Sequence, residues 1–283
     1  MEKTIKDRRI KEANKIIFDR ESRFYSKRRR IKFDRKTSLK LMRDYENVME
    51  DKFQPIDRFL DIGCGNGLIL LNLKPLGFIS KAYGVDLSFG MLKECKSNAN
   101  KLNINVLLVQ SDVEQLPFKD NSFDLIVGHA ILHHLPTARE AFKEVYRVLK
   151  LRGRCIFIEP SKIGSKIIAT LRWFIWSLPF LIRQITKSPM ERLIEVNTFT
   201  PQELEKEARI SGFKIVYTKP FAGFISRIFY WILDPISQRT SNRHYHLIVD
   251  KIINILSILD ERLFRKFIPK GWFDEIFIFM QKI

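Results

Sequence analysis

The 283-residue sequence has few cysteines, no long apolar run and no apolar leader. Its three cysteines, Cys64, Cys95 and Cys155, form no C-x-x-C pair. This argues against a disulfide framework and a zinc site, and it suits a reducing cytoplasm. The charged amino terminus lacks the apolar core of a signal peptide. No apolar run reaches about 18 residues, so we expect no transmembrane helix. From the cysteine usage we expect a cytoplasmic protein, and no cluster of ligand residues implies a metal site.

A glycine-rich stretch, FLDIGCGNGLILL (residues 59–71), predicts a buried strand, a tight turn and a helix. No Lys-Ser or Lys-Thr follows its glycines, which excludes the phosphate loop. In the order Gly63, Gly65, Gly67, the third glycine comes one residue too early for the dinucleotide pattern. Asp61 precedes the turn, where a carboxylate disfavours a pyrophosphate and favours a cationic or amine-bearing ligand.

The next hundred residues alternate between strand and helix patterns. We predict strands over residues 81–86, within 104–118, over 123–128 and over 154–160. A helix is predicted over 140–153, ending at Gly153. Such alternation favours a doubly wound parallel sheet that binds its ligand at the carboxyl ends of the strands.

Together these segments resemble class I S-adenosylmethionine-dependent methyltransferases, especially those of the domain 11-like group that act on small molecules and lipids. The resemblance covers residues 57–160 and rests on five segments in the expected order. They are DIGCGNG (61–67), GVDLS (84–88), SDVEQLPF (111–118), FDLIVGHAILHHL (123–135) and RVLKLRGRCIFIEP (147–160).

The resemblance implies S-adenosyl-L-methionine as the cofactor and a set of binding residues. The set is Asp61, Gly63, Cys64, Gly65, Gly67, Asp86, Leu87, Asp112, Val113 and His129. The sulfonium and ammonium groups of this cofactor would suit a cleft lined with carboxylates.

Position in the family pattern implies a role for each binding residue. Asp61 would face the methionine end of the cofactor, and the glycine turn would wrap it. Asp86 would hold the ribose hydroxyls beside Leu87 on the adenine. Asp112 would accept from the adenine amino group, with the Val113 backbone N–H next to it. Taken singly, each acid could instead cap a turn, end a strand or cap a helix.

Two further residues are candidates for the reaction itself. By the resemblance, His129 lies at the floor of the reaction site, as a general base if the acceptor needs one, although it could also be structural. His133 and His134 are expected to have packing or capping roles. The stretch 18–27 resembles the amino-terminal segment that folds over the cofactor in the small-molecule group. There Tyr25 would close the site over the sulfonium, a cation–π contact of about 0.5–2 kcal/mol.

The net charge of +18 lies outside the predicted cofactor-binding core. Residues 1–40 hold 16 Lys/Arg and 6 Asp/Glu, residues 41–160 hold 15 of each, and residues 161–283 hold 19 and 11. We divide the chain accordingly into six parts. They are a basic arm over the cofactor site (1–40), a Rossmann-like core (41–160), a cap insertion (161–197), a core helix and sixth strand (198–219), a second helical insertion (220–271) and a final strand (272–283).

The carboxyl-terminal part predicts the completion of the sheet and a helical cap. Thr200 and Glu203 make a capping box that starts a helix, followed by strands over 213–219 and 274–282. The expected fold is a seven-stranded sheet, mostly parallel with the last strand antiparallel, capped by the two insertions. The aromatic, basic stretches 167–187 and 221–237 suit a membrane interface or an apolar acceptor, or pack as an ordinary lid core. The periodic stretch 247–264 is expected to be lid core.

These features predict methyl transfer from S-adenosylmethionine to a hydrophobic or amphiphilic small molecule, such as a lipid, an isoprenoid or quinone-like compound or a related metabolite. An anionic membrane surface is a further expected partner, which would place the protein peripherally on the inner face of the membrane. One alternative is an RNA-directed methyltransferase that uses the basic flanks, including KRRRIK (27–32). The other alternative is a non-catalytic S-adenosylmethionine-binding protein. The absence of an Asn-Pro-Pro-Tyr type motif after the fourth strand argues against the DNA and glutamine methylases of this fold.

Overall fold

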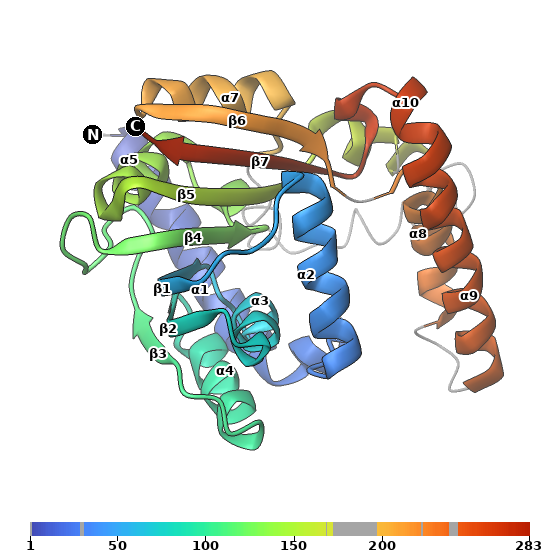
Figure 1. The fold of residues 1–283 in the computed structure, drawn as a ribbon, viewed down its shortest axis with the longest axis horizontal. Helices are drawn as coiled ribbons and strands as arrows, with labels where there is room; N and C mark the ends of the chain where they lie inside the picture. Colours follow the sequence, from blue (N-terminus) through green and yellow to red (C-terminus); the bar gives the residue numbers. More distant parts are fainter. Residues whose placement is uncertain (1, 29–30, 168, 172–196, 222, 238–242) are drawn as a thin grey trace.

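A computed structural model describes residues 2–28, 31–167, 169–171, 197–221, 223–237 and 243–283. Figure 1 shows a twisted sheet with helices on both faces. The sheet has seven strands in the order β3-β2-β1-β4-β5-β7-β6. Strands β1 to β5 are parallel, and β7 runs antiparallel to both β5 and β6. The predicted fold class, including the single antiparallel strand, is confirmed.

The strands are β1 (Ile56–Ile62), β2 (Ile79–Asp86), β3 (Leu107–Gln110), β4 (Phe123–His129), β5 (Leu149–Pro160), β6 (Phe213–Pro220) and β7 (Glu275–Lys282). In register, Ile62 at the end of β1 lies beside Val85 in β2 and Gly128 in β4. The carboxyl ends of these three strands therefore meet at one edge of the sheet, where α/β folds bind ligands.

The helices are α1 (Glu2–Arg28), α2 (Arg35–Met49), α3 (Leu68–Leu73), α4 (Phe89–Lys101), α5 (Ala138–Val148), α7 (Pro201–Ile210), α8 (Ile225–Ser237), α9 (Arg243–Leu259) and α10 (Arg265–Phe267). Short 3-10 turns span Lys74–Leu76, Leu132–His134 and Lys270–Trp272, and a π-helical turn spans Asp260–Phe264. Buried side chains of α2, α3 and α4 form one core cluster with the sheet, and those of α5 and α7 form another. The sheet is thus covered on both faces, as its apolar strands require.

The predicted helix over 140–153 is too long at its carboxyl end. α5 ends at Val148, and residues 149–153 begin β5. Leu149 is fully buried and pairs with Phe123 of β4. Strand pairing and burial therefore overrode the helical spacing of the apolar residues.

The helix predicted from the capping box is α7. The Thr200 hydroxyl accepts from the Glu203 N–H at 3.2 Å, and the Thr200 N–H donates to the Glu203 carboxylate at 2.9 Å.

The predicted boundary at residue 40, between the basic arm and the core, falls inside α2. This helix packs with the core through Tyr45 and Val48.

The cap insertions are described only in part. Residues 162–167 and 169–171 are helical, and most of the aromatic stretch 167–187 lies outside the described residues, as do Arg29 and Arg30 of the basic KRRRIK run. The second insertion forms α8 and α9, which lie side by side (Figure 1). None of the helices described here has the length and apolar character needed to cross a bilayer.

The α8–α9 hairpin is anchored to the sheet at one end. Arg227 of α8 bonds to Asp274 at 2.5 Å and to Glu275 of β7 at 3.1 Å. The Asp260 carboxylate, buried after α9, accepts from the backbone N–H groups of Ile225 and Ser226. The hairpin is therefore fixed in place by charge-assisted hydrogen bonds.

The prediction that residues 247–264 form lid core is wrong for one side of α9. Val249 is buried, but Ile248, Ile255 and Ile258 on the opposite side are more than half exposed. Apolar residues occupy more than one side of this helix, and its neighbour α8 covers only one of them.

Candidate active site

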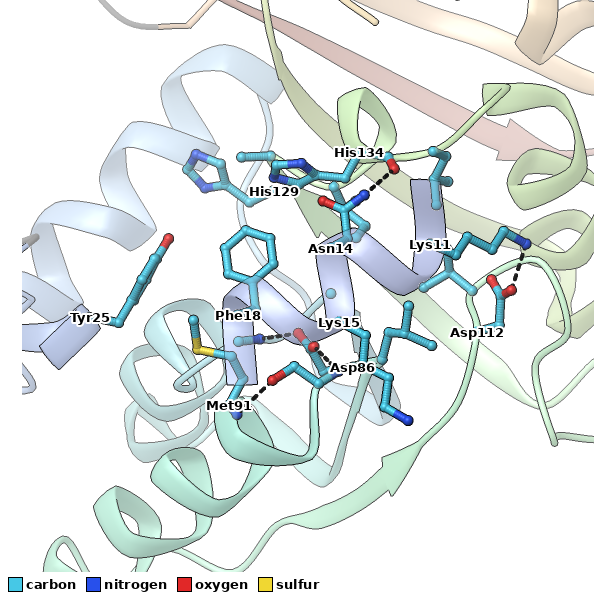
Figure 2. A pocket seen from close by; sticks show the side chains of 18 residues that line it. Lys11, Asn14, Lys15, Phe18, Tyr25, Asp86, Met91, Asp112, His129 and His134 are labelled. Atoms are coloured by element: carbon cyan, nitrogen blue, oxygen red, sulfur yellow. Dashed lines mark hydrogen bonds and ion pairs between the residues drawn. The ribbon is translucent and has the colours of Figure 1, made fainter. Parts of the chain in front are cut away.

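A pocket of about 800 Å³, counting its open mouth, lies at the carboxyl ends of β1 to β4. One wall is formed by the loops after these strands, and α1 crosses the other side (Figure 2). The lining residues are Lys11, Asn14, Lys15, Phe18, Tyr25, Gly63, Gly65, Asp86, Leu87, Ser88, Met91, Asp112, Val113, His129, Ala130, Ile131, His134 and Leu135.

Helix α1 is held over the pocket by polar contacts along its length. Lys11 Nζ bonds to the Asp112 carboxylate at 2.5 Å and also to Glu114. Asn14 donates to the His134 carbonyl at 3.0 Å. The Asp19 carboxylate accepts from the Ser88 hydroxyl and the Gly90 N–H at the start of α4. The amino arm is therefore a structural wall of the site.

Most of the residues predicted to bind the cofactor line this pocket, and three do not. Those that line it are Gly63, Gly65, Asp86, Leu87, Asp112, Val113 and His129, together with the gating candidate Tyr25. Asp61, Cys64 and Gly67 lie behind the lining. Cys64 is buried, and its thiol contacts Cys95, which together with burial raises the pKa of that thiol.

Asp61 is buried beneath the glycine turn. Its carboxylate accepts from the Leu70 N–H at 3.2 Å, near the start of α3. Burial raises the pKa of Asp61 to about 8, and the nearby Asp86 carboxylate adds to this effect. In the ligand-free protein Asp61 therefore carries a proton at neutral pH, because a bare charge there lacks a compensating cation.

Asp86 connects the glycine turn to the start of α4. One carboxylate oxygen accepts from the Gly65 N–H at 2.8 Å, and the other accepts from the Ser88 N–H at 2.9 Å. Burial raises the pKa of Asp86 to about 6, although these hydrogen bonds lower it. Asp86 thus lines the pocket and also fixes the shape of its floor.

Asp112 is engaged by α1. One of its oxygens bonds to Lys11, and the other accepts from the Glu114 N–H at 3.0 Å. Burial opposes the charge on Lys11, but its bonds to Asp112 and Glu114 outweigh this and raise the pKa of Lys11. A ligand amino group at Asp112 would therefore share this carboxylate with Lys11.

His129 ends β4 and faces the pocket near Tyr25 (Figure 2). Its ring lies edge-on to Phe221, with centroids 6.1 Å apart. Burial lowers the pKa of His129, which keeps the ring neutral at pH 7. Its Nδ1 atom is shielded from solvent and has no hydrogen-bond partner among the described residues. A buried ring nitrogen of this kind is available to a ligand.

A buried carboxylate shapes the loop that follows His129. Glu159 accepts from the backbone N–H groups of Ile131 and Leu132 at 2.9 and 2.7 Å, and from His133 Nδ1 at 2.9 Å. Ala130 adopts the left-handed conformation, with a φ of 57°. The structural role expected for His133 agrees with its bond to Glu159.

Several lining residues lie outside the predicted set. His134, expected only to pack or cap, lines the pocket, and its ring lies 5.1 Å from that of Phe18. The other lining residues outside the set include three on one face of α1: Lys11, Asn14 and Phe18. They are three and four positions apart, and this helical spacing is a signal in the amino-terminal sequence that could have identified them. Among the described residues, no three His, Cys, Asp or Glu side chains are arranged to hold a metal ion.

The pocket fits the cofactor implied by the resemblance. The carboxyl groups of the buried Asp61 and the partly exposed Asp86 have raised pKa values, and a sulfonium or ammonium group nearby would stabilise their charged forms. Gly65 has a φ of 52° and lines the pocket, and a Cβ there would meet no atom within 4 Å. The open space beside Gly65 lets a ligand approach the backbone closely.

Comparison with known proteins agrees with this geometry. Residues 60–157 match a methyltransferase domain family. The chain is 30% identical over 182 residues to the demethylmenaquinone methyltransferase of Symbiobacterium thermophilum, covering 59% of this chain and 72% of that protein. It is 31% identical over 181 residues to the ubiquinone/menaquinone biosynthesis C-methyltransferase UbiE of Rickettsia prowazekii, covering 60% and 73%.

The fold is also similar to solved structures. One is the geranyl diphosphate C-methyltransferase of Streptomyces coelicolor, determined with Mg²⁺, geranyl diphosphate and S-adenosylhomocysteine. The TM-score is 0.54 at 17% identity, with 87% of this chain and 80% of that chain covered. The similarity to this structure shows the fold, and the identity to the two quinone-biosynthesis methyltransferases over 72% and 73% of their lengths establishes the family: the chain belongs to the class I S-adenosylmethionine-dependent methyltransferases, whose methyl donor is S-adenosylmethionine.

Proposed function

We propose that this methyltransferase acts on a hydrophobic or amphiphilic small molecule of the quinone or isoprenoid lipid class. The observation that carries the proposal is the apolar surround of His129. Phe18 and Ile131 line the pocket with His129, and the Phe221 ring lies against its imidazole. Such a wall favours an apolar acceptor and disfavours a nucleotide base, which needs polar partners for its edges.

The names of the relatives support the same class of acceptor. Two proteins about 30% identical to this chain are named for methylation of demethylmenaquinone or of quinone precursors. An acceptor of the quinone lipid class combines an aromatic head with an apolar tail. A head seated near His129 would leave its tail in the apolar part of the pocket or beyond its mouth.

In this proposal the loops after the strands hold the methyl donor. Asp86 would accept from the ribose hydroxyls, with Leu87 beside the adenine, and Asp112 with Val113 would contact its far edge. Asp61 would face the ammonium end through the glycine turn. When bound, S-adenosylmethionine supplies a methyl group on a positively charged sulfur.

The residues of this chain would contribute position and one proton acceptor. Helix α1 and Tyr25 would exclude water from the methyl group and hold the acceptor in line with it, an effect worth at most about 7–11 kcal/mol. Neutral His129 would accept the proton that the acceptor releases, at Nδ1, which has no protein partner among the described residues.

Gly65→Ala is expected to weaken S-adenosylmethionine binding at least about tenfold, because its methyl group would occupy the space of the ligand. Gly77→Ala is the matched control, since Gly77 also has a positive φ and open space but lies away from the pocket. Both variants should lose roughly 1–2 kcal/mol of stability through backbone strain. Calorimetric titration and denaturant unfolding measure the two effects. Equal cofactor affinity in both variants would contradict the proposed approach at Gly65.

Asp61→Asn should stabilise the ligand-free protein increasingly as the pH rises from about 4 to about 8. Over this range folded Asp61 retains a proton that the unfolded chain has released, so stability of the parent protein falls with rising pH. The limit is roughly 1.4 kcal/mol per pH unit. The variant should also bind S-adenosylmethionine more weakly.

Denaturant unfolding at pH 5, 7 and 8.5 measures this difference as its pH dependence. A constant difference between the two proteins at all three values would mean that Asp61 is ionised in the fold. Unchanged cofactor affinity would remove its proposed contact with the ammonium group.

His129→Gln is expected to lower kcat by about 10²-fold or more without a loss of cofactor affinity. The parent protein should lose activity as the pH falls below the ordinary histidine pKa of 6.5, because burial lowers the pKa of His129 and only the neutral ring accepts a proton. The variant should lack this acid limb. The measurement is a pH–rate profile of both proteins. If the variant shows the same loss of activity at low pH, a group other than His129 causes that loss.

The acceptor class is tested by transfer of radiolabelled methyl groups from S-adenosylmethionine into extract of the source cell. The extract is separated into lipid, polar small molecules, RNA and protein, and Gly65→Ala provides the background. Label in the lipid fraction is expected. Label in RNA would make the basic arm a nucleic-acid clamp and overturn the proposed acceptor, and no label with intact cofactor binding would favour a non-catalytic role.

A further inference from the structure

Helix α9 presents an apolar strip to solvent from Leu247 to its end at Leu259. Six aliphatic residues on its outer side are exposed: Leu247, Ile248, Ile252, Ile255, Ile258 and Leu259. They recur at intervals of three and four residues, so they form one continuous face. Phe267, which follows in α10, is 81% exposed. Contiguous apolar surface of this extent marks an interaction site.

The strip belongs to a helix that is already anchored on its other side. Val249 is buried toward α8, and the Tyr245 hydroxyl donates to the Leu233 carbonyl at 3.5 Å. Figure 1 shows α9 as the outermost helix on the side toward which the β4 arrow points. Helix α9 therefore lies at the surface of the molecule, beyond the carboxyl ends of the strands.

The charges on the same side are all positive among the described side chains. Lys251, Arg262 and Lys266 are exposed, and helical spacing places them among the aliphatic residues. The exposed acid of α9, Asp250, lies one turn after Leu247, at one edge of the strip and apart from the three cations. Long basic side chains can extend past an apolar strip to reach anionic groups at its edge.

This combination distinguishes between two possible occupants. A second copy of the chain, packed symmetrically on this face, would bring Lys251, Arg262 and Lys266 against the same cations. A bilayer with anionic headgroups instead accepts aliphatic side chains at the acyl boundary and cations at the phosphates. The overall charge of +18 adds attraction to such a surface.

We propose that the outer face of α9 docks the protein onto an anionic lipid bilayer, with α9 lying in the plane of the interface. The six aliphatic residues enter the headgroup boundary, and Lys251, Arg262 and Lys266 contact lipid phosphates. This docking uses residues that do not line the pocket. It does not depend on the identity of the methyl acceptor.

The test is co-sedimentation of the full-length protein with vesicles of phosphatidylcholine, alone or mixed with phosphatidylglycerol in equal parts. We expect binding to the mixed vesicles that weakens with added salt. The triple variant Ile248→Gln, Ile255→Gln, Ile258→Gln should bind at least about tenfold more weakly. Ile210→Gln on α7 is the matched control, because Ile210 is 53% exposed and the three substituted isoleucines are 52–58% exposed.

Three results would overturn the proposal. They are no binding to anionic vesicles, equal binding by the triple variant and the control, or a dimer in light scattering that only the triple variant abolishes. The variants carry substitutions at exposed positions, and an unchanged S-adenosylmethionine affinity shows that they are folded. Because vesicle binding is measured without turnover, its failure is separate from a failure to find the lipid acceptor.

Discussion

Burial of two carboxyl groups where β1 and β2 end is the constraint on which the site depends. Asp61 and Asp86 lie under the glycine turn, and burial raises the pKa of both carboxyl groups. The hydrogen bonds of Asp86 to Gly65 and Ser88 fix the loop, so the same residue that costs solvation energy also shapes the floor. A cationic ligand removes part of that cost, which links binding of the methyl donor to the protonation of the protein.

Helix α1 adds a second layer of charge to this arrangement. Its carboxylate Asp19 caps the start of α4, while its Lys11 neutralises Asp112 and Glu114. The basic arm therefore makes specific contacts, because Lys11 pairs with the two acids that follow β3. Positive charges elsewhere in the flanks, such as those on the outer face of α9, can contact anionic partners.

The sequence predicted the succession of strands along the chain and most of the strand-end residues that line the pocket, because glycine spacing and acids at strand ends are local signals. It could not predict the wall formed by α1, since Lys11 and Asp112 are 101 residues apart. It also could not show that Cys64 faces Cys95 instead of the pocket, which depends on how the turn packs on α4. The helix extended to Gly153 failed because Leu149 finds a partner in β4. The exposed strip of α9 could not be predicted, because apolar periodicity does not show which side of a helix packs against a neighbour.

The position of β7 between β5 and β6 has a consequence for the order of folding during synthesis. Among the described residues, β6 is an edge strand that pairs with β7 alone, and α7 packs next to it. Until residues 275–282 emerge from the ribosome, β5 has an open edge and β6 has no sheet to join. The five parallel strands can assemble early, whereas the antiparallel part must wait for a contact across a long stretch of chain, and such contacts are slow to form. The α8–α9 hairpin is synthesised before β7, while the sheet is incomplete. At this stage its apolar faces are exposed, and a chaperone or an apolar surface would shield them.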